Sequence, residues 1–156
     1  MWMREIALVA LLCAPSACTS ADRGSDGFVK LRALDDTSRN SECLALSNEK
    51  KIELFFEAQQ RHHEYFGFDQ CFASSPTTFM DALKSEIVKR GTVESARHYI
   101  MVIAISQQQG RTSNAEIKAM ELPQLCKSLA DERPSGNPSQ CIKMAEDLLE
   151  KGVRDN

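Results

Sequence analysis

The sequence predicts an all-α protein, a small bundle of about five helices held by two disulfides, which follows a signal peptide and a flexible tether. From Ser47 onward apolar residues recur at helical spacing, and no segment shows sustained alternation with a period of two. A chain of 156 residues, 42% hydrophobic and 26% charged, has the size and balance of one globular domain. We therefore expect a single helical domain over residues 41–156.

The N-terminus has the order of a secretory signal peptide. A short basic start, residues 1–4, precedes an apolar run of nine residues, 6–14, and then a stretch of small residues. The apolar run is shorter than the roughly 20 residues that span a bilayer as a helix. We expect residues 1–21 to be a signal peptide or lipoprotein signal. A retained anchor or a buried helix is the alternative, and Glu5 slightly favours it.

The sequence Pro15-Ser16-Ala17-Cys18 resembles a bacterial lipobox, in which the cysteine is lipidated and becomes the first mature residue. Pro15 stands where that motif usually has leucine. Cleavage after Ala17 without a lipid would leave five cysteines, whereas a lipid on Cys18 or cleavage after Ala21 leaves an even four to pair. The sequence therefore does not decide whether Cys18 is lipidated. A lipid on Cys18 would be the one contact with a membrane.

Residues 22–40 are rich in Asp, Gly, Ser and Arg and contain few apolar residues, which predicts a flexible tether. Within it, Phe28 to Leu34 could form a short ordered segment.

The first predicted helix of the bundle begins with Ser47 as its cap, runs to about Phe66 and stops at Gly67. The second covers residues 75–91, with a serine cap, a proline in the first turn and a terminal glycine.

Thr92 caps the third predicted helix, which runs to Gly110. Its centre, residues 99–105, is apolar on every side, as expected for the buried helix of a bundle. A buried strand is the competing interpretation of this β-branched run, but the capped length of the segment favours a helix.

Ser113 and Glu116 have the spacing of a capping box and predict a fourth start. Pro123 should interrupt this helix, after which the helical pattern resumes over residues 122–131. A loop rich in Pro and Gly, residues 133–138, precedes a last helix over residues 137–152.

Cys43, Cys71, Cys126 and Cys141 should form two disulfides, because exported chains oxidise their thiols and no C-x-x-C spacing is present. Three connectivities are possible. Cys126 with Cys141 is favoured, because these residues lie on successive helices joined by a short loop. Cys43 is then left with Cys71, and both flanks of a helix about 28 Å long would have to fold back along it.

His62, His63 and Glu64 are the candidate catalytic or metal-binding residues. His63 falls in the middle of an apolar helix face, where a hydrogen-bonded core histidine is the commoner case. Adjacent histidines on a helix diverge, and a metal needs three or four converging donors. Motifs for nucleophilic catalysis or phosphate binding are also missing. We expect no cofactor and no catalytic residues, and keep a metal site at these three residues as the alternative.

Most of the phenylalanines fall between residues 55 and 79. They either form one corner of the core or expose rings at the turn that contains Tyr65, Phe66 and Phe68, where aromatic side chains could anchor a partner.

The formal net charge of -3, without a run of Lys or Arg longer than two, argues against nucleic-acid binding. We expect a small exported protein of the bacterial periplasm that binds another envelope or secreted protein without catalysis, as inhibitors and immunity proteins do. The alternatives are an envelope enzyme or metal-handling protein that uses His62, His63 and Glu64, and a structural lipoprotein.

Overall fold

The computed structural model describes residues 23–61 and 67–154, and every regular element within these ranges is a helix. The all-α prediction is therefore confirmed. The described residues contain nine helices, more than the five or so expected, because α1, α2 and α4 were not predicted. The helices are α1 (Arg23–Arg32), α2 (Asp36–Leu44), α3 (Asn48–Arg61), α4 (Asp69–Ala73), α5 (Thr77–Arg90), α6 (Val93–Gln108), α7 (Asn114–Ala119), α8 (Leu122–Glu132) and α9 (Pro138–Arg154).

Residues 23–40, predicted as a flexible tether, instead form α1 and the start of α2. One aromatic side chain explains the difference: Phe28 is 1% exposed, and its ring centroid lies 5.6 Å from that of Phe68. Asp35 caps α2 by accepting from the backbone N–H of Ser38 at 3.0 Å. A single buried ring and one cap thus order a segment whose average composition resembles a linker.

The later helices begin and end close to their predicted signals. Thr92 caps α6 and Ser113 caps α7, each in a complete capping box. α5 ends at Gly91, as expected. The helix interruption predicted at Pro123 occurs slightly earlier, at Glu121. The backbone of this residue is left-handed, with a φ of 50°, and this residue separates α7 from α8.

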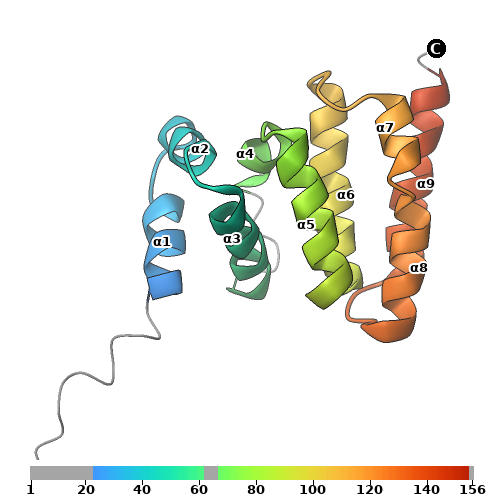
Figure 1. Ribbon diagram of the computed structural model, residues 1–156, viewed down its shortest axis with the longest axis horizontal. Coiled ribbons are helices and arrows are strands. Elements are labelled where there is room, and N and C mark those ends of the chain that lie inside the picture. Colours follow the sequence, from blue (N-terminus) through green and yellow to red (C-terminus); the bar gives the residue numbers. More distant parts are fainter. Residues whose placement is uncertain (1–22, 62–66, 155–156) are drawn as a thin grey trace, which may run out of the picture.

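α6 is the central helix of the molecule. It packs against α4 and α5 on one side and against α8 and α9 on the other, while α1, α2 and α3 lie at the far end from α9 (Figure 1). Tyr99, Val102 and Ile103 of its apolar centre are fully buried. The prediction of a buried helix over residues 99–105, in place of a strand, is confirmed.

Two disulfides link neighbouring helices, as predicted from the four cysteines. Cys43 and Cys71 join α2 to α4 with a Cα–Cα distance of 6.1 Å, so both flanks of α3 do fold back. Cys126 and Cys141 join α8 to α9 at 5.8 Å.

The predicted signal segment, including Cys18, lies outside the described residues. No helix in residues 23–61 or 67–154 is long and apolar enough to cross a membrane.

We predict that removing Cys43–Cys71 destabilises the protein more than removing Cys126–Cys141. The first bridge closes a span of 28 residues and the second a span of 15. Loop-closure entropy then gives losses of about 3.5 and about 3 kcal/mol in the free energy of unfolding. Urea denaturation of the two Cys→Ala double variants would measure this, and a larger loss for Cys126–Cys141 would show that loop entropy does not set the order.

Candidate partner-binding groove

The structure does not support Phe68 as an exposed partner contact. Phe68 is 1% exposed and packs between Phe28 and Phe72, with its ring centroid 6.2 Å from that of Phe72. The described phenylalanines between residues 55 and 79 therefore belong to one corner of the core. Tyr65 and Phe66 lie outside the described residues.

The predicted metal residues His62, His63 and Glu64 also lie outside the described ranges. Within those ranges, no group of three His, Cys, Asp or Glu side chains could hold a metal ion. His98, in α6, instead forms a contact of 2.6 Å between its Nε2 and Oδ1 of Asp69 in α4, and both residues are buried. The imidazole also stacks on Phe55 at 4.6 Å. This pair is therefore a polar contact that joins α4 to α6 inside the core.

A groove of about 470 Å³ lies between α1 and α3, and we call it the α1–α3 groove. Its apolar residues come from both helices and from the turn that precedes α3: Phe28, Leu31, Leu46 and Leu54. Its charged residues all come from α3: Glu49, Lys50, Glu53 and Glu57. The groove thus combines an apolar lining with a mainly acidic rim.

The helical repeat of α3 explains why the carboxylates align. Glu49, Glu53 and Glu57 are spaced by four residues, which places them one turn apart along the same side of the helix. The opposite side of α3 carries buried residues such as Phe55 and Ala58. The three carboxylates therefore form a row beside the apolar groove.

The row is only partly neutralised by the protein itself. Glu53 pairs with Arg90 at 2.6 Å, but 70% of the Glu53 side chain is exposed. Glu49 forms no ion pair with another described residue. Burial raises the pKa of Glu57 above its usual 4.5, and the charge of Glu53 adds to this while Arg61 opposes it. Nε of Arg61 lies 3.3 Å from the Glu57 carboxylate, so Glu49 is the one carboxylate of the row without an ion pair among the described residues.

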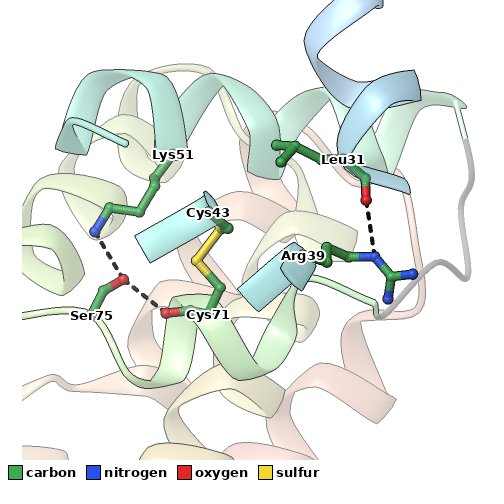
Figure 2. The surroundings of a disulfide bond; sticks show 6 residues. All are labelled: Leu31, Arg39, Cys43, Lys51, Cys71 and Ser75. Carbon is green, nitrogen blue, oxygen red and sulfur yellow. Dashed lines mark hydrogen bonds between the residues drawn. A yellow bond between two sulfur atoms is a disulfide. The ribbon is translucent and has the colours of Figure 1, made fainter. Parts of the chain in front are cut away.

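Arg39 of α2 holds the C-terminal end of α1 in place (Figure 2). Its Nε donates to the carbonyl of Leu31 at 3.2 Å, and its Nη2 donates to the carbonyls of Arg32 and Leu34 at 3.2 and 2.6 Å. Leu31 and Arg32 lie in the last turn of α1 and Leu34 in the turn that follows, and the carbonyl of Leu31 also accepts from the backbone N–H of Leu34. Asp36 fixes the guanidinium from the other side at 2.8 Å. Arg39 thereby positions one wall of the groove.

Lys51 fixes the other wall, α3, to the rest of the fold. Its Nζ donates to Oγ of Ser75 at 3.0 Å, and Ser75 donates in turn to the carbonyl of Cys71 at 2.8 Å (Figure 2). Nζ also lies 5.0 Å from the centre of the Phe79 ring. Lys51 is 2% exposed, and burial lowers its pKa below the usual 10.5.

The sequence indicates one side of this groove, the row of glutamates, but not the side formed by α1. The four-residue spacing of Glu49, Glu53 and Glu57 is visible without a structure. The wall formed by α1 is not, because its segment has the composition of a tether. Comparisons with protein-family models, curated proteins and solved structures find no match to this chain, so its function must be argued from this geometry.

We predict that Arg39→Met releases α1 without unfolding the remaining helices. Loss of hydrogen bonds from a charged donor should lower the free energy of unfolding by about 2 kcal/mol. Hydrogen exchange should show lost protection of amides 28–34, with α8 and α9 unchanged. Lys30→Met, which removes an exposed cation on α1, is the control and should have little effect; equal loss in both variants would contradict the role of Arg39.

We predict that Lys51→Met is neutral to stabilising at neutral pH, because it removes a buried charge and keeps the shape of the side chain. Because the pKa of Lys51 is lower in the folded state, the native protein binds this proton less tightly than the unfolded chain does. The contribution of Lys51 to the free energy of unfolding therefore rises as the pH approaches 10.5. The advantage of the variant should therefore shrink from neutral to alkaline pH. Urea denaturation across that range would measure it, and a variant strongly destabilised at neutral pH would refute it.

Proposed function

We propose that this chain is a non-catalytic binding protein of the bacterial envelope, of the inhibitor or immunity type, and that it holds a protein partner in the α1–α3 groove. The observation that carries the proposal is the row of three carboxylates beside an apolar groove.

The groove matches the way in which amphipathic helices are recognised. Such a helix lays its apolar face into an apolar groove and presents anchors one turn apart. Basic residues at four-residue spacing on the partner would face Glu49, Glu53 and Glu57 in register. Charge complementarity of this kind sets specificity and speeds association. The expected partner segment is therefore a basic amphipathic helix of another envelope or secreted protein.

The envelope location rests on the signal-like residues 1–21 and on the even set of paired cysteines. Disulfides persist in oxidising compartments such as the periplasm. Both bridges in the described residues support such a compartment. A lipid on Cys18 remains the one proposed link to a membrane. The alternative of an enzyme or metal-handling protein rests on His62, His63 and Glu64, and that of a structural lipoprotein on Cys18, all outside the described residues.

We predict that the groove binds a short amphipathic peptide of leucine and lysine and rejects its counterpart of leucine and glutamate. The triple variant Glu49→Gln, Glu53→Gln, Glu57→Gln should weaken binding of the lysine peptide about tenfold or more, since close charge pairs contribute strongly to such interfaces. Lowering the pH through the raised pKa of Glu57 should weaken binding by the wild type, because a protonated carboxyl attracts no cation. Isothermal titration calorimetry would measure each value.

The matched control removes three carboxylates that lie on the exposed surface outside the groove, through Glu42→Gln, Asp131→Asn and Glu146→Gln. Both triple variants change the net charge equally. Equal weakening in both would show that overall charge, not the groove, attracts the peptide. Native capture from envelope extracts with the same three proteins would then identify the partner, which should be lost only from the groove variant.

A further inference from the structure

A second cavity, of about 230 Å³, lies between α5, the end of α6 and α7, and we call it the α5–α7 cavity. At roughly 30 Å³ per molecule in the liquid, its volume corresponds to about eight waters, which fits a small ligand and not a protein segment. Its hydroxyl groups belong to Ser75, Thr77, Ser106 and Thr112, and its charged groups to Asp81, Lys84, Arg111 and Glu116.

Charges of both signs line this cavity, yet they do not neutralise one another. Asp81, Lys84, Arg111 and Glu116 form no ion pair with any described residue. Elsewhere on the described surface such groups do pair, as Arg97 does with Glu94 and Lys89 with Glu86. Lys84 donates to the carbonyl of Met120 at 2.5 Å, and Glu116 accepts from the backbone N–H of Ser113 at 2.7 Å. Neither contact neutralises a charge, so the cavity still offers both signs to a ligand that carries both charges.

One end of the cavity is positive. Nη1 of Arg111 donates to the carbonyl of Ser74 at 3.0 Å, which places the guanidinium beside Ser75. Behind Ser75 stands the buried ammonium of Lys51. The N-terminus of α5 begins at Thr77, with no acidic residue in its first turn, and adds the partial positive charge of the helix dipole.

The opposite charge comes from Asp81, one turn further along α5, and from Glu116 in the first turn of α7. Hydrogen bonds from the backbone and side chain of Ser113 lower the pKa of Glu116 and keep it ionised at neutral pH. Gly110, with a φ of 70°, makes the turn after α6 that brings Arg111 to this cavity.

We propose that the α5–α7 cavity binds a small zwitterion with the chemistry of a free α-amino acid. Its carboxylate lies toward Arg111 and the N-terminus of α5, and its ammonium toward Asp81 and Glu116. The hydroxyls of Ser106 and Thr112, 2.7 Å apart, remain to bind the ligand between these ends, because only one of them donates to the other. This site is separate from the α1–α3 groove and does not depend on the function proposed for it.

The test is titration of the full-length, isotope-labelled protein with each of the common free amino acids, followed by the amide signals of Ser106, Thr112 and Ala119. At least one amino acid should give saturable shifts at these amides. Arg111→Gln and Asp81→Asn should each weaken its binding about tenfold or more, as expected for the loss of a charge-assisted contact. Shifts with no amino acid, or unchanged affinity in both variants, would overturn the proposal.

Two controls separate this site from weaker alternatives. Lys127→Gln and Asp131→Asn remove exposed charges on α8, outside the cavity, and should bind as the wild type does. Acetate and methylammonium each supply one half of the ligand and should bind more weakly than the best amino acid. Acetate that binds equally well would show a simple anion site and refute the zwitterion. Circular dichroism of each variant would establish that the helices remain formed.

Discussion

The arrangement of the N-terminal helices depends on Cys71 of α4, which is bonded in two directions. Its sulfur joins α2, while its carbonyl accepts from Ser75, which in turn accepts from Lys51 of α3. α2 carries Arg39, which holds the end of α1. Both walls of the α1–α3 groove are therefore positioned relative to the same residue. Since α4 itself packs on the central helix α6, the groove is part of the fold and not a loosely attached appendage.

Two charged groups in this region lie in environments that disfavour their ionised forms. Burial lowers the pKa of Lys51 and raises that of Glu57, so each charge costs some stability in the unbound protein. Lys51 has a structural reason for its position, since it bridges α3 to Ser75. Glu57 pairs with Arg61 at 3.3 Å, which offsets part of the cost of its burial.

Caps and glycines made the later helices predictable, because those signals act on the few residues around them. Thr92, Ser113 and Gly91 mark helix ends in the sequence and in the structure alike. α1 escaped prediction because its order comes from tertiary contacts, namely the packing of Phe28 on Phe68 and the hydrogen bonds from Arg39, which composition cannot reveal. The same reason explains why the sequence predicts only one part of the candidate site. The spacing of the α3 glutamates can be read from the sequence, but the wall formed by α1 depends on tertiary packing. The sequence left the position of Phe68 open, because an aromatic side chain at a turn can face either solvent or the core.

The four paired cysteines bond in chain order, Cys43 with the next one, Cys71, and Cys126 with the next one, Cys141. Neither loop encloses or crosses the other. A chain that is oxidised progressively from its N-terminus meets the correct partner for each thiol first, so it can reach this pairing without breaking a wrong bond by thiol–disulfide exchange. The two bridges therefore close separate, consecutive loops, an arrangement that these four cysteines can reach with little thiol–disulfide exchange.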